Sequence, residues 1–121
     1  MNAESVSSLL KQEPQRPAIV SGSIQLSRRD LDELSASIGE YLSSLGVDAL
    51  SRRVALVMHE PHNMLVGIVG ALRARWSFIP LSPSWPSERL AEILRRLRPK
   101  FVVCSDKTVA SSSGEQDAFE A

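Results

Sequence analysis

Short extended or apolar runs alternate with helical segments along this chain, and this alternation limits the fold more than any other feature. The extended runs are residues 54–58, 77–81 and 101–104, and the helical segments lie over 64–74 and between Ser84 and Pro99. A run such as 54–58, with no polar alternation, is typical of a strand that is covered on both faces of a parallel sheet. Strands alternating with helices predict right-handed β-α-β crossovers. We therefore expect an α/β fold with a partial parallel sheet and flanking helices.

The part of the chain before residue 50 predicts a hairpin followed by a long amphipathic helix. Residues 18–20 and 23–26 are short extended runs on either side of Ser21-Gly22, which is typical of a hairpin. Ser27 is a good N-cap, and Asp30 three residues later fits a capping box. Gly46 favours the left-handed conformation that ends a helix. The apolar positions between them repeat at steps of three and four residues and define one helical stripe: Leu31, Leu34, Ile38, Tyr41, Leu42 and Leu45.

The two later helices are expected to pack differently. The segment 64–74 is apolar nearly all round, and its small residues would let it lie close to a sheet or a neighbouring helix. These small residues are Gly67, Gly70, Ala71 and Ala74. In the next helix, Ser84 is the expected cap and Pro86 suits the first turn. Its expected buried stripe is Leu90, Ile93, Leu94 and Leu97.

Three regions follow from this organisation. Residues 1–16 are expected to hold a short helix over 4–12, with Val6, Leu9 and Leu10 as its apolar residues, and a lead-in segment. Residues 17–106 carry the hairpin, the sheet and the main helices. Residues 107–121 are rich in serine, weakly apolar and charged, and we expect them to be disordered.

The charge balance argues against a nucleic-acid partner. The 121 residues contain 14 Lys and Arg and 14 Asp and Glu, whereas a nucleic-acid binder usually has a basic excess. The cluster of Arg95, Arg96, Arg98 and Lys100 is interpreted as a solvated helix end, where cations suit the dipole. No apolar run is long enough to span a bilayer, and the N-terminus has no signal-peptide pattern. We therefore expect no membrane partner and a cytoplasmic protein.

Isolated residues that could carry chemistry all have a simpler structural explanation. Cys104 is the only cysteine and sits in an apolar run, so a buried core position is expected. His59 and His62 have no third ligand nearby, whereas zinc needs three or four, and a strand-to-helix turn is the preferred interpretation. The phosphate-binding P-loop signature is absent, and the run 111–114 lacks the second glycine and the lysine of a phosphate loop.

Three short motifs carry a resemblance to a known family. Motif 1 is Leu-Ser-Arg-Arg-Asp-Leu at 26–31, motif 2 is Arg-Val-Ala-Leu at 53–56, and motif 3 spans residues 71–90. Motif 3 resembles the pattern L-K-A-G-x-x-Y-x-P-L-D-P-x-Y-P-x-E-R-L of adenylate-forming enzymes, the AMP-dependent synthetases and ligases. The Y-P-x-E-R-L ending is most similar to the adenylation domains of nonribosomal peptide synthetases. Motif 1 resembles the family's L-T/S-Y-x-E-L, and motif 2 its R-V-A-L strand. The resemblance covers about residues 17–106, and it implies the N-terminal subdomain of that fold.

Several positions depart from the family pattern. Arg28 replaces a tyrosine of motif 1. In motif 3, a lysine, a glycine, a tyrosine, an aspartate and a second tyrosine are replaced by Arg73, Arg75, Phe78, Ser82 and Trp85. Phe78 and Trp85 keep the aromatic bulk. Arg75 is expected to carry strain, because a glycine at the end of a helix adopts a positive φ that costs other residues about 1 kcal/mol.

The resemblance also implies which chemistry lies elsewhere. Family members convert a carboxylate and ATP into an acyl-adenylate and pyrophosphate, and a complete member uses ATP and Mg²⁺. The phosphate loop, the adenine and ribose contacts and the catalytic lysine come later in the family's sequence. This chain has no residues that match them, so we assign no catalytic, cofactor-binding or metal-binding residue, and we expect it to bind no cofactor alone.

Three interpretations remain open at this level. The first is a truncated adenylation domain, inactive alone, whose partner would be the remainder of the domain or a synthetase. The second is a non-catalytic docking or binding module derived from that fold, whose open sheet edges would recruit a partner and whose helix 64–74 is too apolar to face water. The third is a complete small flavodoxin-like enzyme or receiver domain.

Overall fold

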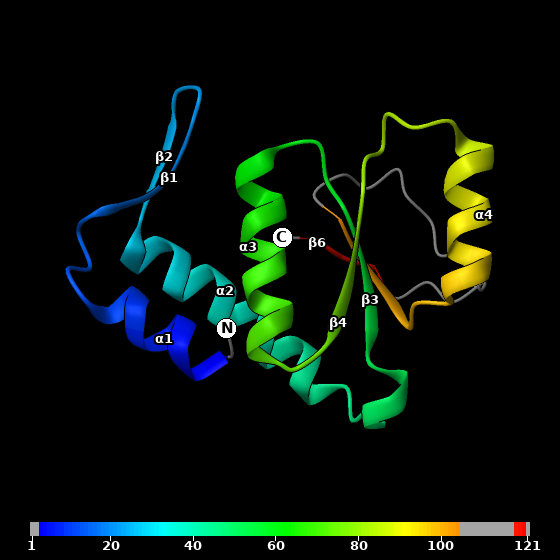
Figure 1. The fold of residues 1–121 in the computed structure, drawn as a ribbon, viewed down its shortest axis with the longest axis horizontal. Helices are drawn as coiled ribbons and strands as arrows, with labels where there is room; N and C mark the ends of the chain where they lie inside the picture. Colours follow the sequence, from blue (N-terminus) through cyan, green and yellow to red (C-terminus); the bar gives the residue numbers. More distant parts are fainter. Residues whose placement is uncertain (1–2, 105–117, 121) are drawn as a thin grey trace.

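A computed structural model describes residues 3–104 and 118–120 of the chain (Figure 1). Apart from a short 3₁₀ helix and the last strand, the helices and strands follow one another in the expected order. They are α1 Ala3–Lys11, β1 Pro17–Ser21, β2 Ile24–Ser27, α2 Arg28–Ser44, the short 3₁₀ helix η1 Ala49–Ser51, β3 Arg53–Val57, α3 Pro61–Arg73, β4 Ser77–Leu81, α4 Ser87–Leu97, β5 Phe101–Cys104 and β6 Ala118–Glu120. Within these residues, no helix is both long and apolar enough to cross a membrane.

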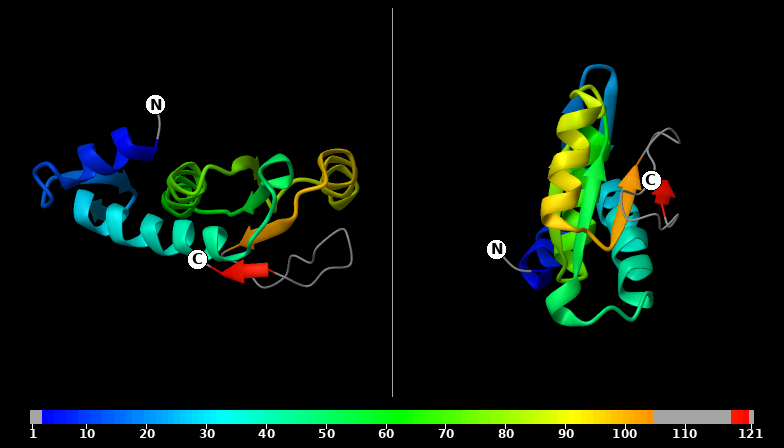
Figure 2. Two further views of the ribbon diagram at one scale, coloured as in Figure 1. Left: turned by 90° about the horizontal axis from the view of Figure 1, so that it is seen from below. Right: turned by 90° about the vertical axis from the view of Figure 1, so that its right-hand side faces the viewer.

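A parallel sheet lies at the centre of the fold, with strand order β4-β3-β5-β6. β3 pairs with β4 on one side and with β5 on the other, so that Ala55 lies opposite both Ile79 and Val102. Since β4 and β5 flank β3, crossovers of one hand must place their helices on opposite faces. Figure 2 shows the strands between α3 and α4. The predicted α/β class and the parallel sheet are therefore confirmed.

Strand β3 is apolar from Val54 to Val57 because both of its faces are covered there. Val54 and Leu56 belong to the core that also holds residues of α1, α2 and α3. Ala55 and Val57 point the other way, into a smaller core completed by Leu94 of α4 and Cys104. Alternate residues of a strand face opposite sides, so a doubly covered strand needs no polar positions. The buried position predicted for Cys104 is also confirmed.

Helix α3 is held tightly by its two glycines, as the small residues predicted. A Cβ atom at Gly67 would lie 3.2 Å from Leu56 Cδ2, and one at Gly70 would lie 2.6 Å from Ile38 Cγ2 of α2. α3 is thus pressed against the sheet at Gly67 and against α2 at Gly70. Its residues Val66, Val69 and Ala71 are buried. The face of α3 that is turned to the sheet and to α2 is therefore covered by this chain itself, whereas Leu65 of the same helix is 38% accessible.

The hairpin and the start of α2 form as predicted. β1 and β2 pair antiparallel, and Gly22 in the turn has a φ of +60°. Ser27 Oγ accepts the Asp30 N–H, while Asp30 Oδ2 accepts the Ser27 N–H, which completes the capping box. Gly46, just beyond the end of α2, has a φ of +65°. Local sequence signals therefore set both ends of this helix.

Two leucines that were predicted to be buried in the first two helices are in fact exposed. Leu34 of α2 and Leu9 of α1 are 47% and 45% accessible. The buried place beside Leu31 and Ile38 is taken by Ser35, which is fully buried. The Ser35 carbonyl oxygen would lie only 3.2 Å from a Cβ at Gly70, so the close approach of α3 favours a small residue here. Among the described side chains of α1, Val6 and Leu10 belong to the core.

The boundaries of α3 and α4 also differ from expectation. α3 begins three residues early, at Pro61, because proline suits the first helical position. The N-cap of α4 is Pro86, not Ser84. Ser84 is instead held in the preceding turn, where its N–H donates to Ser82 Oγ at 3.2 Å. Of the expected stripe of α4, Leu94 is buried and Leu97 is exposed.

The predicted disordered region, 107–121, lies outside the described residues except at its end. Ala118–Glu120 forms β6 and pairs in parallel with β5. The prediction is therefore wrong for these three residues, since β5 offers them a strand edge to pair with.

Candidate functional site

An ion pair joins motif 3 to the helix in which motif 1 ends, across α2 and α3. Arg73 Nη1 donates to Asp32 Oδ1 at 2.6 Å, to the Asp32 carbonyl oxygen at 3.2 Å and to Ser35 Oγ at 3.1 Å. The two charged side chains are only 18% and 22% accessible. Asp32 follows motif 1 by one residue, and Arg73 stands at the lysine position of the family pattern. A partly buried, charge-assisted contact therefore links motif 3 to the residue that immediately follows motif 1.

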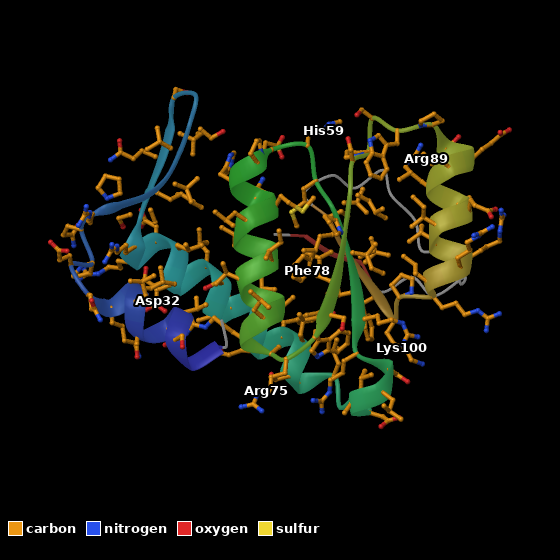
Figure 3. The ribbon with its side chains drawn as sticks, viewed as in Figure 1. Asp32, His59, Arg75, Phe78, Arg89 and Lys100 are labelled. Atoms are coloured by element: carbon orange, nitrogen blue, oxygen red, sulfur yellow. The ribbon has the colours of Figure 1, made fainter. Side chains whose placement is uncertain are left out.

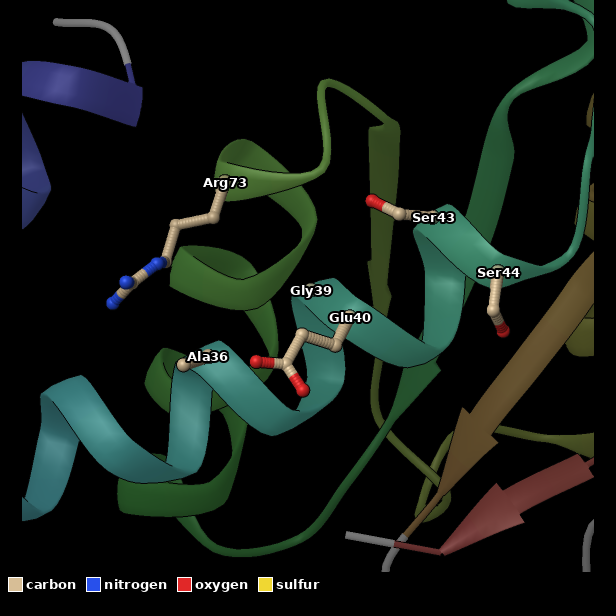
Figure 4. A pocket seen from close by; sticks show the side chains of 6 residues that line it. All are labelled: Ala36, Gly39, Glu40, Ser43, Ser44 and Arg73. Atoms are coloured by element: carbon tan, nitrogen blue, oxygen red, sulfur yellow. The ribbon is translucent and has the colours of Figure 1, made fainter.

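A shallow groove of about 480 Å³ lies beside this ion pair. Its lining comes from α2 and the end of α3: Ala36, Gly39, Glu40, Ser43, Ser44 and Arg73 (Figure 4). The guanidinium of Arg73 is directed to Asp32, so the groove offers only Glu40 and small polar side chains. This combination provides no nucleophile with an adjacent base and no pair of acidic groups for proton transfer.

The arginine of motif 2 fastens the end of a helix. Arg53 Nε donates to the Leu97 carbonyl oxygen at 3.0 Å, and Nη2 to that of Arg98 at 3.3 Å. Nη1 donates to the Leu50 carbonyl oxygen of η1 at 3.0 Å. The last carbonyls of a helix lack partners and carry partial negative charge, so a guanidinium is well suited to them. Arg53 therefore fixes α4 to the start of β3.

Residues that depart from the family pattern also make contacts that stabilise the fold. Arg28, in place of tyrosine, donates from Nη1 to the Gln12 carbonyl oxygen at 2.8 Å, just beyond the end of α1. Trp85 stands in place of tyrosine. The guanidinium carbon of Arg89 lies over its ring, 5.3 Å from the centroid of the Trp85 ring. Such cation–π contacts stabilise an exposed turn modestly. Phe78 packs against the main core.

Arg75 adopts the left-handed conformation that the sequence predicted. Its φ is +62°, and it occupies the C′ position of α3. The Arg75 N–H donates to the Leu72 carbonyl oxygen at 3.1 Å, and the Trp76 N–H to that of Ala71 at 2.9 Å. These two bonds define a Schellman motif, in which glycine is usual at C′. The predicted strain at this position is therefore present in the backbone.

We expect Arg75→Gly to raise the free energy of unfolding by about 1 kcal/mol, because glycine adopts a positive φ without the Cβ clash. The measurement is urea unfolding of both proteins, followed by far-UV circular dichroism. Arg29→Gly is the matched control, because Arg29 lies in the first turn of α2 with a regular helical conformation. The control variant Arg29→Gly should have a lower free energy of unfolding. If Arg75→Gly lowered it as well, Arg75 would not be strained.

The two histidines do not form a shared site. His59 is exposed between β3 and α3, in the strand-to-helix turn that was expected, and His62 is in the first turn of α3. His62 Nδ1 is buried and has no hydrogen-bond partner among the described residues. Within the same residues, no three His, Cys, Asp or Glu side chains gather as metal ligands. The serine run 111–114 lies outside the described part of the chain.

The basic end of α4 is paired with an acid of its own helix. Glu92 accepts from Arg95 Nη2 at 2.6 Å and from Arg96 Nε at 2.9 Å. The hydrogen bond from Arg95, followed by that from Arg96, holds the pKa of Glu92 below its usual range. The contribution of this network is present at neutral pH and is lost as the pH falls through that lowered pKa. The network is on the helix surface and faces no cavity.

Sequence reasoning did not identify the three clamping arginines: Arg28, Arg53 and Arg73. Each guanidinium donates a hydrogen bond to a carbonyl or carboxylate oxygen of a residue 16 to 45 positions away in the sequence. The available signal was their placement within the motifs themselves, at the border of a helix or strand.

Comparisons with known proteins agree with the motifs. A family model described as AMP-binding enzyme matches residues 7–120. Nonribosomal peptide synthetase GRA1 of Gibberella zeae is 37% identical over 95 residues, which is 78% of this chain and 1% of that protein. Bacitracin synthase 3 of Bacillus licheniformis is 36% identical over 94 residues, 78% of this chain and 2% of that protein. The chain thus spans a very small part of these relatives.

Solved structures share the fold. The nonribosomal peptide synthetase FmoA3, in its AMPPNP-bound form, superposes with a TM-score of 0.83 at 19% identity, covering 98% of this chain and 13% of that one. VinN in complex with 3-methylaspartate superposes with a TM-score of 0.80 at 18% identity, covering 99% of this chain and 34% of that one.

Proposed function

This chain belongs to the AMP-binding enzyme family, and from that membership we propose that it serves as the opening section of an adenylation domain. The observation that carries the proposal is the joining of the three motifs into one framework. Arg73 ties motif 3 to Asp32 of the helix in which motif 1 ends, and motif 2 lies in β3, which pairs with β4 of motif 3. Arg53 of motif 2 also ties β3 to the end of α4. The charged motif residues therefore brace the fold, which is the work of a scaffold section.

We infer that the parent activity is ATP-dependent conversion of a carboxylate to an acyl- or aminoacyl-adenylate. Such chemistry needs preorganised charge around the transferring group. The guanidinium groups of Arg28, Arg53 and Arg73 are already engaged by carbonyl and carboxylate oxygens. Binding of ATP and Mg²⁺ is therefore assigned to other segments of a complete domain, which would be the partner of this section. The proposed location is the cytoplasm.

The expected result of an ATP–pyrophosphate exchange assay with a panel of carboxylates is no turnover by this chain alone. Exchange should appear when the chain is co-expressed with the remainder of an adenylation domain, such as the matching one of bacitracin synthase 3. The positive control is that synthase's own opening section added to the same remainder. Turnover by the chain alone would contradict the proposal. So would failure to complement where the control section succeeds.

A further inference from the structure

We propose that the edge of the sheet where the parallel strands begin is a docking surface for an acidic protein face with apolar side chains. We define this basic edge by five cationic and two apolar residues: Arg52, Arg53, Arg75, Arg98, Lys100, Leu50 and Leu97. This docking role is separate from carboxylate activation, so it is tested by a binding assay and not by a turnover assay.

Strand pairing brings the cations together. The Ser77 N–H donates to the Arg52 carbonyl oxygen at 2.8 Å, and the Lys100 N–H donates to that of Arg53 at the same distance. Strands β4 and β5 therefore begin on either side of the start of β3. Arg75 precedes β4 by two residues, and Lys100 immediately precedes β5. Figure 3 shows Arg75 and Lys100 along the border from which the strands run.

The positive charge of this edge is not neutralised by the described residues. None of its five cations forms an ion pair with them, whereas Arg16, Arg73, Arg95 and Arg96 elsewhere do. Arg52 and Arg53 donate only to carbonyl oxygens, which carry no net charge. The whole chain has zero formal net charge, so the basic edge is a local asymmetry. The exposed Asp48 precedes η1 at this edge, so the surface is predominantly and not wholly basic, and such a surface attracts a partner of the opposite sign.

Exposed leucines at the same edge indicate the class of partner. Leu50 is 87% accessible and Leu97 is 45% accessible. The carbonyl oxygens of both accept hydrogen bonds from the single guanidinium of Arg53, so the two residues are neighbours. Protein interfaces combine an apolar centre with a polar rim, whereas nucleic-acid binding relies on phosphate contacts and does not need exposed leucine. The occupant is therefore an acidic protein face. The matched region is 1% and 2% of two related synthetases, so most of each of those proteins lies outside it.

The test uses the full chain and a fluorescently labelled synthetic peptide, an amphipathic helix with glutamate on one face and leucine on the other. Anisotropy should show saturable binding that weakens as salt is added. The double variant Arg75→Glu with Lys100→Glu should weaken binding about tenfold or more. The matched control, Lys11→Glu with Arg29→Glu, changes the net charge equally on exposed residues elsewhere and should leave the affinity unchanged.

A second set of measurements separates a protein partner from other anions. Leu50→Ser should weaken binding of the glutamate–leucine peptide and leave the weaker binding of an all-glutamate peptide unchanged. Oligo-dT and vesicles containing phosphatidylserine should bind less tightly than the amphipathic peptide. Circular dichroism checks that each variant is folded. If the double variant Arg75→Glu with Lys100→Glu unfolds, Arg75→Gln with Lys100→Gln is used in its place. The proposal is overturned by absence of peptide binding, by equal loss in the control, or by tighter binding of DNA or vesicles.

Discussion

Gly70→Val is expected to lower the free energy of unfolding by about 3 kcal/mol, because it overfills the closest helix contact of the fold. A Cβ at this position would lie 2.6 Å from Cγ2 and 2.7 Å from Cβ of Ile38, and 3.2 Å from the Ser35 carbonyl oxygen. Ile38 is buried, and the carbonyl belongs to the backbone of α2. Neither the Ile38 side chain nor the Ser35 carbonyl group can make room for the added side chain unless α2 moves. The measurement is the midpoint and slope of urea unfolding.

Gly67→Ala is the matched control on the same helix. Its Cβ would lie 3.2 to 3.3 Å from the terminal carbon atoms of Leu56 and Met58, which can rotate. The gain in helix propensity, about 1 kcal/mol, should offset this crowding, so stability should change little. If both glycine variants lost the same stability, the close approach of α2 and α3 would not be the cause.

Leu56→Ala is expected to cost about 2–5 kcal/mol, the range for deleting a fully buried leucine side chain. Leu56 is completely buried in β3, beneath α3. Urea unfolding of this variant should be compared with that of Leu50→Ala, where the leucine is 87% accessible and the loss should be small. Equal losses at the two positions would contradict the placement of Leu56 in the core.

The combination of Leu56→Ala with Gly67→Ala adds a sharper test of the same contact. The cavity left by Leu56 borders the position of the added Cβ, so that methyl group can fill part of it. The double variant should therefore be more stable than the sum of the two single effects predicts. Strict additivity in a double-mutant cycle would show that α3 does not rest on Leu56.

Local signals in the sequence predicted the elements whose cause is local. The capping box of Ser27 and Asp30 and the left-handed Gly46 both depend on atoms within a few residues. The alternation of strands and helices predicted the parallel sheet, and the family-like motifs predicted the positive φ of Arg75. The exposure of Leu34 could not be read in this way, because periodicity gives a stripe but not the position of the neighbouring helix. The approach of Gly70 decided that Ser35 is buried there.

The amino-acid sequence by itself determined the class of the fold, its order of elements and the family, since these depend on periodicity, capping residues and motifs along the chain. Only the tertiary structure decided what the charged motif residues do. Arg53 and Arg73 reach their acceptors through contacts 44 and 41 positions apart, which no local pattern specifies. The same pairing of distant strands gathers Arg52, Arg75 and Lys100 at one edge, because parallel strands begin on the same side of a sheet.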